Sequence, residues 1–436
     1  MDRIFKNPAR IASSVLSFKN IVLGRIANPL SKLSLVDMLS KDFGINLNLN
    51  SVYKMMDKID DEAIERLKDL SYKNTASLFK EKIDVIFFDV TAVYFECFFE
   101  DELRKNGYSK DLKFNQPQVV LALMATKEGL PAGYEAYPGD IYEGHTLIPS
   151  LKKLKERYSI DKVVFVADSG MFNKDNLKEL ENNGFDYIVG CRIKNLPASL
   201  KEKILDKSNY KNIQEGLSIS TFIHNGKRLI ATVSEQRAKK DEHDRLKGIL
   251  KLKGKLFRSS SVKDYISNMG YKKYLNIADG NITLNEERIK EEERWDGLKG
   301  IITNSSLSDL EILSQYKNLY QVEESFRITK HDLKIRPVFH YKPERVKAHI
   351  AICYASHMLV RHLEHIVRVR YKRLSIEQIK RCLFGVQTSV ILDKSKKIRF
   401  SVPSTISPEA KRIYSLMDVD SVRTPRIIES FKKFKL

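Results

Sequence analysis

The spacing of apolar residues predicts helices at the start of the chain. Residues 1–82 have helical periodicity. Within them the stretch SLVDMLSKDFGINLNLNSVYKMMDKI predicts one helix, a turn at Gly44 and a second helix capped by Asn50 or Ser51. The two helices joined by a short turn have the order of a helix-turn-helix, an arrangement that ordinary all-helical packing also produces. Both interpretations stay open at this stage.

From Ile83 onward the pattern changes to that of strands. IDVIFFDVTAVYFECFF is rich in β-branched and aromatic residues, and PQVVLALMATKEGLPAGYEAYPG predicts two strands around a turn at residues 127–129. HTLIPSLKKLKERY then predicts a helix, KVVFVADSG a buried strand, NKDNLKELENNGF a helix stopped by Gly184, and DYIVGCRI another strand. Strands followed by alternating helices and strands indicate an α/β fold with a mixed sheet.

The second half of the chain divides into three further segments. Residues 195–296 are predicted to form a β-rich insertion, with a hairpin at Asn225-Gly226 followed by a heavily charged helix. Residues 297–345 return to the α/β pattern and include YKNLYQVEESFRITKHDLKI, which predicts one amphipathic helix. Residues 346–436 are predicted to be helical and basic. The full predicted division is therefore 1–82, 83–194, 195–296, 297–345 and 346–436.

The charge of the chain points to a polyanionic partner. Its 76 Lys and Arg against 56 Asp and Glu give a net charge of +20. A surplus of this size favours nucleic acid, although a basic protein without such a partner is the alternative. Residues 340–436 hold 21 basic and 8 acidic residues, which makes this segment the leading candidate for phosphate contact. Its run LDKSKKIRF offers Lys394, Lys396 and Lys397 to a DNA backbone, with a solvated loop as the other interpretation.

Cysteine use and hydropathy predict a cytoplasmic protein. The four cysteines are far apart and form no CxxC pair, so neither a zinc site nor a disulfide framework is expected. No run approaches the ~20 apolar residues that a membrane span needs. The first ten residues, MDRIFKNPAR, lack the apolar core of a signal peptide.

Two aspartates are predicted at the ends of buried strands. Asp89 closes VIFFD, and Asp168 closes VVFVAD and is followed by a turn. The end of such a strand is the usual ligand-binding edge of α/β folds, although an aspartate there often only begins a turn. With a glutamate on a later helix, the two would make a set of hard oxygen ligands for Mg²⁺. Two ions held in this way assist phosphoryl transfer by activating the attacking oxygen and stabilising the leaving one.

Helical geometry indicates which of two adjacent glutamates, Glu323 or Glu324, is the third metal ligand. An apolar stripe predicts the buried face of the helix and consists of Leu319, Val322, Phe326 and Leu333. An adjoining row consists of Tyr316, Glu323, Arg327 and Lys330. Glu324 points about 100° further round. Glu323, at the edge of the stripe and beside cations able to hold DNA phosphate, is therefore the predicted metal ligand.

These residues carry a resemblance to a known family. The chain resembles the DDE transposases of bacterial insertion sequences, in the IS-four-like branch of the retroviral-integrase superfamily that bears a Tyr-Arg-Glu-Lys signature. Tyr316, Glu323 and Lys330 match the signature at its spacings, whereas Leu319 stands at the position of the arginine. FFDVTAVYFE and VFVADSGMF resemble the blocks of the first and second catalytic aspartates, which correspond to Asp89 and Asp168.

The resemblance implies a fold and an activity. It implies an RNase H-like core at 83–194 and 297–345, interrupted by the insertion. The helical regions on either side follow from the residue pattern, and the N-terminal one, 1–82, is predicted to bind DNA. It implies two Mg²⁺ ions per active site, with Mn²⁺ as a substitute. The expected activity is cut-and-paste transposition, and the expected partners are inverted-repeat element ends, target DNA and a second copy of the chain on paired ends. A nucleoid-associated location would follow.

Two further matters stay open. Trp295 is the only tryptophan of the chain. In some members of the family an insertion-domain tryptophan stacks on a flipped base, although ordinary packing of a large aromatic is the simpler interpretation. For the whole chain, the alternatives to a transposase are an RNase H-like nuclease without strand transfer and a non-catalytic, end-binding repressor derived from a transposase.

Overall fold

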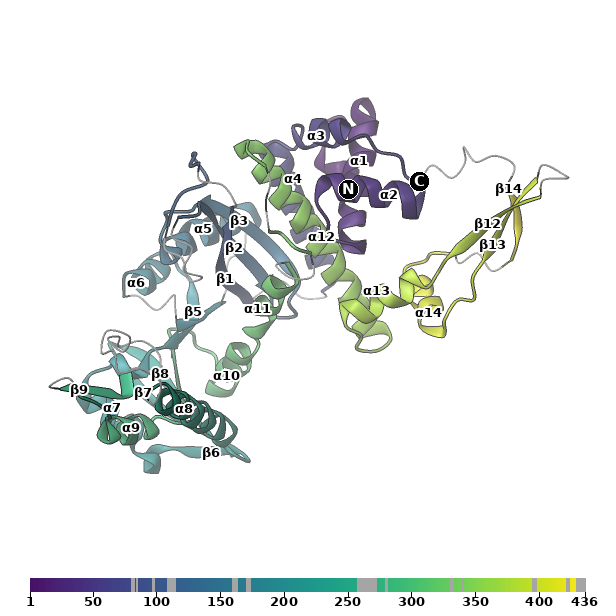
Figure 1. The fold of residues 1–436 in the computed structure, drawn as a ribbon. Helices are drawn as coiled ribbons and strands as arrows, with labels where there is room; N and C mark the ends of the chain where they lie inside the picture. Colours follow the sequence, from purple (N-terminus) through teal and green to yellow (C-terminus); the bar gives the residue numbers. More distant parts are fainter. Residues whose placement is uncertain are drawn as a thin grey trace. The chain divides into compact units, whose positions relative to one another are not determined.

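A computed structural model gives the fold (Figure 1). It describes residues 1–79, 83, 85–95, 99–107, 115–158, 164–169, 174–256, 273–278, 281–329, 333–336, 338, 340–393, 398–420 and 424–428. The chain divides into two compact units, which are described separately below. The first unit comprises Met1–Val163 and Lys317–Leu436, and the second comprises Val164–Tyr316.

The first unit combines an antiparallel sheet with helices from both ends of the chain. Its strands are β1 (Val85–Tyr94), β2 (Gln118–Thr126), β3 (Pro131–Pro138), β12 (Thr388–Asp393), β13 (Ile398–Pro403) and β14 (Arg426–Ile428). Its helices are α1 (Ala12–Ala27), α2 (Lys32–Phe43), α3 (Leu49–Met56), α4 (Asp61–Ser77), α5 (Leu147–Tyr158), α11 (Tyr320–Arg327), α12 (Pro343–Arg370), α13 (Ile376–Phe384) and α14 (Pro408–Leu416). Short 3₁₀ helices are η1 (Asp2–Ile4), η2 (Pro8–Ile11) and η3 (Glu143–Thr146).

β1, β2 and β3 form an antiparallel meander in the predicted order. All nine residues of β2 are buried, because β2 lies between two neighbours and helices cover the sheet. α11 packs on β1 and β2, while α4 and α12 pack on β3. A buried ion pair ties α4 to the sheet, since Lys68 Nζ lies 2.7 Å from Glu135 Oε1. The predicted turn between β2 and β3 is present and contains Gly129 at φ +75°.

The predicted pair of N-terminal helices is present as α2 and α3. Gly44 ends α2 in the left-handed conformation at φ 65°, as the turn requires. The second helix begins earlier than predicted, because Asn48 caps it by accepting a hydrogen bond from Asn50 N at 2.8 Å. The expectation that Asn50 or Ser51 is the cap is therefore wrong by two or three residues.

The C-terminal region is not wholly helical, contrary to prediction. After α12 and α13 the chain forms an antiparallel sheet in which β13 lies between β12 and β14. The alternation of Ile398, Phe400 and Val402 with polar residues has the period of a strand. The basic composition of this segment obscured that period.

The second unit is built on a mixed sheet. Its strands are β4 (Val164–Ala167), β5 (Asp186–Cys191), β6 (Lys211–Gln214), β7 (Leu217–His224), β8 (Lys227–Ser234), β9 (Leu275–Ala278), β10 (Asn281–Leu284) and β11 (Leu298–Thr303). Its helices are α6 (Lys174–Asn182), η5 (Ile193–Asn195), α7 (Ala198–Leu205), η6 (Lys207–Asn209), α8 (Glu235–Leu256), α9 (Glu286–Glu293) and α10 (Asp309–Lys317), the last of which ends one residue beyond the unit.

β4 and β5 are parallel and joined by α6, as the alternating pattern predicted. β5 pairs antiparallel with β11, β11 with β8, β8 with β7 and β7 with β6. Strands β6, β7 and β8 of the predicted insertion therefore extend the sheet that β4, β5 and β11 begin, whereas β9 and β10 pair with each other in a separate two-stranded sheet. The hairpin at Asn225-Gly226 joins β7 to β8, with both residues at positive φ.

The α/β class and the mixed sheet predicted from the sequence are confirmed. No helix among the described residues is long and apolar enough to cross a membrane. Cys191, Cys353 and Cys382 are free thiols, and Cys97 lies outside the described residues.

Candidate active site

Asp89 lies in the middle of a strand and not at its end. β1 continues five residues beyond it to Tyr94, and Asp89 pairs in register with Leu123 of β2. Its side chain is half-buried, and Oδ1 accepts a hydrogen bond from Val90 N at 2.8 Å. The prediction of a strand end was wrong because apolar residues resume directly after the aspartate, and a single half-buried polar residue does not stop a strand.

The predicted single helix at residues 316–335 is two helices. α10 ends at Lys317 and α11 begins at Tyr320. Between them the backbone tightens, since Gln321 N donates to Asn318 O at 2.9 Å in a three-residue turn. Asparagine favours such turns over a helix interior. Tyr316 and Glu323 therefore do not share one row on one helix, contrary to prediction.

The apolar stripe is confirmed, because all four of its residues are buried: Leu319, Val322, Phe326 and Leu333. On α11, Glu323 is exposed and makes no hydrogen bond or ion pair among the described residues. Its neighbour Glu324 is bound by Arg327, and this hydrogen bond lowers the pKa of the Glu324 carboxyl. α11 therefore offers one uncommitted carboxylate, and that carboxylate is the predicted one.

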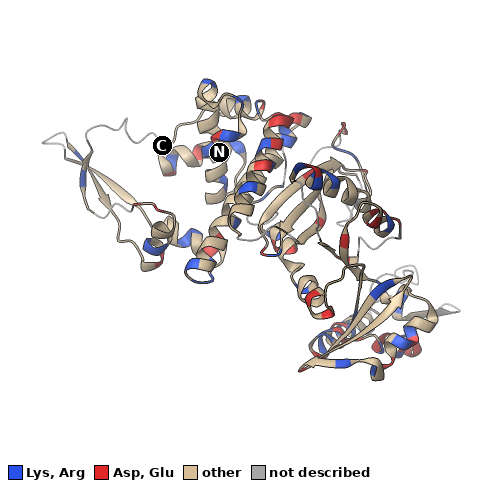
Figure 2. Ribbon diagram, turned by 180° about the vertical axis from the view of Figure 1, so that it is seen from behind, with Lys and Arg blue, Asp and Glu red and all other residues tan. Residues whose placement is uncertain are grey.

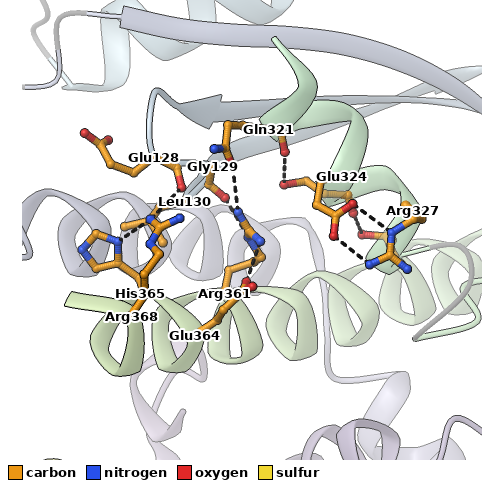
Figure 3. A network of polar contacts seen from close by, with 12 residues as sticks. Glu128, Gly129, Leu130, Gln321, Glu324, Arg327, Arg361, Glu364, His365 and Arg368 are labelled. Atoms are coloured by element: carbon orange, nitrogen blue, oxygen red, sulfur yellow. Dashed lines mark hydrogen bonds and ion pairs between the residues drawn. The ribbon is translucent and has the colours of Figure 1, made fainter. Parts of the chain in front are cut away.

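A buried arginine fixes α11 against the sheet (Figure 3). Arg361 of α12 is 4% exposed, and its Nε donates to the carbonyl oxygen of Gly129 at 3.0 Å. Its Nη1 lies 2.6 Å from Glu364 Oε2, and its Nη2 lies 3.4 Å from Oε1 of Gln321 on α11. One guanidinium thus joins the β2–β3 turn, α11 and α12. No local sequence pattern predicts this network, because it depends on contacts between distant segments.

In the second unit, Asp168 directly follows β4 and is exposed, as predicted. Tyr316 lies close to the neighbouring strand: a Cβ atom at Gly190 of β5 would be 2.3 Å from the Tyr316 hydroxyl and 2.9 Å from Ser169 N. The structure thus brings Tyr316 close to the residue that follows Asp168. Gly190 is a functional candidate that the sequence analysis missed, and its signal was a glycine inside an otherwise apolar strand.

Trp295 lines a pocket of about 360 Å³ within the second unit. Its half-buried ring lies 5.8 Å from Lys194 Nζ, measured to the ring centroid. Glu292 holds two cations at the same pocket, with Lys194 at 2.9 Å and Lys273 at 2.6 Å. The tryptophan therefore borders open space beside cations and is not enclosed in a core.

The predicted DNA contacts are placed only in part. Tyr316, Trp295 and Arg327 are described, whereas Lys330, Lys394, Lys396 and Lys397 lie outside the described residues. Figure 2 shows Lys and Arg on elements of both units, interspersed with Asp and Glu. Most of the net charge of +20 nevertheless comes from residues 340–436, which hold 21 basic and 8 acidic residues.

The predicted metal ligands come from both units, Asp89 and Glu323 from the first and Asp168 from the second. Within the described part of the chain, no group of three or more His, Cys, Asp and Glu residues is placed to hold a metal ion. The carboxylate oxygens of Asp89, Asp168 and Glu323 are the kind of donor that Mg²⁺ and Mn²⁺ prefer. Because α11 packs on β1, the elements that carry Asp89 and Glu323 touch. The uncommitted carboxylate of Glu323 fits the role of a ligand.

The described residues show an α/β fold with a mixed sheet, and the three carboxylates remain predicted ligands of a divalent metal ion. A family model described as the transposase DDE domain matches residues 80–359, well over half of the chain. The chain belongs to the DDE transposase family. A comparison with curated proteins finds no significant match.

Solved transposases are similar in structure. One is the piggyBac transposase in a synaptic complex with hairpin DNA, with a TM-score of 0.44 and 9% identity over 87% of this chain and 71% of that chain. The Mos1 transposase paired-end complex with left transposon end has a TM-score of 0.18 and 13% identity, covering 36% of this chain and 53% of that chain. The Mos1 mariner paired-end complex with Mn has a TM-score of 0.16 and 14% identity, with coverages of 36% and 54%. The family assignment rests on the domain match and not on these likenesses.

Proposed function

We propose that this protein is the transposase of an insertion sequence and moves it by a cut-and-paste route. The observation that carries the proposal is the match to the transposase DDE domain over residues 80–359, a span that includes Asp89, Asp168 and Glu323. A water molecule would cleave the phosphodiester bond at each element end and leave a 3′-hydroxyl. That hydroxyl would then attack a phosphodiester of target DNA and expel its 3′-oxygen.

Asp89, Asp168 and Glu323 would together hold two divalent ions, Mg²⁺ or Mn²⁺. When bound, such ions activate the attacking oxygen and stabilise the leaving one. The chain contributes positioning. Val90 N holds one oxygen of Asp89, and the Arg361 network holds α11 and with it Glu323. Leu319, the residue that precedes α11, is buried, so this position supplies apolar packing where the signature of the IS-four-like branch has an arginine.

The remaining roles concern DNA. Tyr316, Arg327 and Lys330 are proposed to contact phosphates near the scissile bond, and the pocket beside Trp295 is proposed to receive an unpaired base. Lys394, Lys396 and Lys397 are proposed as further backbone contacts. Assembly as a homodimer on paired inverted-repeat ends, within the bacterial cytoplasm and nucleoid, completes the proposal.

Incubation of the full chain with Mg²⁺ and DNA that bears the element ends and their flanks tests this function. The element ends would be identified as short inverted repeats that bracket the coding region. Cleavage followed by joining to a target plasmid supports a transposase. Cleavage without joining would indicate a nuclease, and end binding without cleavage would indicate a repressor; either result would overturn the proposal.

A further inference from the structure

A basic pocket of about 240 Å³ lies in the first unit, and neither Asp89 nor Glu323 is among its described lining residues. Its wall is formed by the loop between α1 and α2, by the start of α2, by α12, and by Lys334, Arg336 and His340. The titratable and cationic residues that line it are Arg25, Lys32, Lys334, Arg336, His340 and His349, together with Tyr53. None of the described lining residues is an Asp or a Glu. Among the described residues that line it, the pocket therefore gathers several basic side chains and no carboxylate.

Lys32 is 6% exposed, yet its hydrogen-bond partner is a neutral group. Its Nζ lies 3.0 Å from His349 Nδ1, while His349 Nε2 lies 2.9 Å from the carbonyl oxygen of Ile335. Since a carbonyl only accepts, Nε2 carries the ring proton and Nδ1 accepts from Lys32. A buried ammonium is ordinarily paired with a carboxylate, because an unpaired buried charge is costly.

Arg25 is 2% exposed and also lacks an acidic partner among the described residues. Its Nη2 donates to the carbonyl oxygen of Lys334, and its Nε has no hydrogen-bond partner in the described part of the chain. A buried guanidinium N–H without an acceptor is rare in folded proteins. This donor and the Lys32 ammonium lie in the wall of the same pocket.

The electrostatic consequences are visible at neighbouring groups. Burial and the nearby charge of Arg25 lower the pKa of Lys32 to about 7. Burial and the charges of Lys32, Arg345 and Arg25 lower the pKa of His340 to about 4. Burial is the larger cause of both shifts, and the neighbouring cations add a smaller contribution that an anion in the pocket would reduce.

The start of α2 adds to this potential. α2 is a 12-residue helix, and Ser31, Lys32 and Leu33 at its N-terminus line the pocket. Ser31 Oγ accepts from Ser34 N at 3.1 Å and so caps one of the free N–H groups. The others remain available, and the partial positive charge at a helix N-terminus favours an anion.

We propose that this pocket binds a phosphate group between Arg25, Lys32 and the N-terminus of α2. A guanidinium, an ammonium and helix N–H groups form the donor set that recognises phosphate. The phosphate could be a free anion or a phosphodiester of the DNA backbone. The second source rests on the proposed function, because it requires that the chain bind DNA.

A substitution at the rim tests the proposal without disturbing the core. Leu33 lines the pocket and is 65% exposed, so Leu33→Glu would place a carboxylate there at a helix position that tolerates an acid. The full chain is titrated with inorganic phosphate in a calorimeter, with the ionic strength held constant by chloride. The wild type should bind phosphate. Leu33→Glu should weaken this binding about tenfold or more, a change of ~1.4 kcal/mol in binding free energy. Leu33→Gln controls for the loss of leucine. Leu23→Glu, at an exposed site on α1 outside the pocket lining, controls for the added charge.

A second pair of variants removes charge. Lys32→Gln should weaken phosphate binding, whereas Lys41→Gln, at the exposed end of the same helix, should not. If Lys32→Gln fails to fold, the comparison of Leu33→Glu with Leu33→Gln alone tests the proposal. Two results would overturn the proposal. One is that phosphate binds the wild type no better than chloride does. The other is that phosphate binds Leu33→Glu and Leu33→Gln equally well.

Binding of a mixed-sequence DNA duplex separates the two sources. A backbone phosphate in the pocket predicts that Leu33→Glu and Lys32→Gln weaken DNA binding more than their controls. It also predicts that Lys32→Gln lowers the log–log salt slope by about one. If Leu33→Glu and Lys32→Gln lose phosphate binding but bind DNA as their controls do, the pocket binds a free anion. Because the phosphate titration uses neither element ends nor catalysis, failure of the transposase proposal would leave its result intact.

Discussion

The guanidinium of Arg327 binds the carboxylate of Glu324 through two hydrogen bonds, Nε to Oε2 at 2.8 Å and Nη2 to Oε1 at 2.7 Å. This ion pair indicates which of the two adjacent glutamates on α11 is available to bind a ligand. Glu324 is committed to a neighbour on its own helix, and Glu323 is not. An ion pair this exposed stabilises the fold by about 1 kcal/mol at most.

Glu323→Gln should therefore abolish DNA cleavage, whereas Glu324→Gln should reduce it only a few-fold. Asp89→Asn and Asp168→Asn should behave as Glu323→Gln does, because each removes one carboxylate from the proposed metal site. Cleavage of end-bearing DNA and gel-shift binding to the same DNA measure the two effects, and binding should survive in all four variants. Equal losses in Glu323→Gln and Glu324→Gln would show that the assignment on α11 is wrong.

Local patterns predicted much of this fold. The period of apolar residues correctly located β1 to β5, α5, α6 and the buried stripe beneath α11, since burial on one face is a local property of sequence. Gly184 and Asn225-Gly226 were predicted as a helix stop and a hairpin, and all three residues have positive φ. These positions accept few other residues, so their signal is strong.

The errors have a common physical origin in tertiary context. A half-buried aspartate within β1 has the same sequence signal as one at a strand end, because the neighbouring strand and helix decide where the strand stops. The break between α10 and α11 lies at residues whose apolar spacing continues a single helix. No pattern within α12 could show that Arg361 would reach the turn at Gly129, more than two hundred residues earlier.

Gly129→Ala should destabilise the first unit far more than Gly44→Ala. Both glycines have positive φ, and a methyl group at either costs ~1 kcal/mol in backbone strain. At Gly44 the new Cβ meets nothing within 4 Å, while at Gly129 it would lie 2.2 Å from Arg361 Nη2 and 2.7 Å from Gln321 Oε1. Urea unfolding of the two variants should differ by about 2 kcal/mol. Similar losses in both would mean that the Arg361 network does not hold the turn.

Gly190→Ala should impair cleavage by displacing Tyr316 or the backbone at Ser169. The new methyl group would lie 2.3 Å from the Tyr316 hydroxyl, and such a contact forces one of the two to move. Adding Tyr316→Phe removes the closest clash and should recover part of the lost stability, which thermal unfolding measures. Gly254→Ala on α8, where a Cβ meets nothing within 4 Å, is the matched control and should fold as the wild type does. If Gly190→Ala has full activity, Tyr316 does not need its present position.

Acid should destabilise the first unit through His357 of α12, which is 1% exposed and has no hydrogen-bond partner among the described residues at either ring nitrogen. Burial lowers its pKa to about 3. The unfolded state, with a pKa near 6.5, takes up a proton that the folded state does not, so the stability present above pH 6.5 falls steadily toward pH 3. Between pH 7.5 and 5.5 the loss from this one residue should be ~1.4 kcal/mol.

Hydrogen exchange of α12 amides at the two pH values measures the loss. His357→Leu should remove this part of the pH dependence and, because it leaves no unsatisfied nitrogen, should stabilise α12 at pH 7.5 by about 1 kcal/mol. An unchanged pH dependence in His357→Leu would show that another group is responsible.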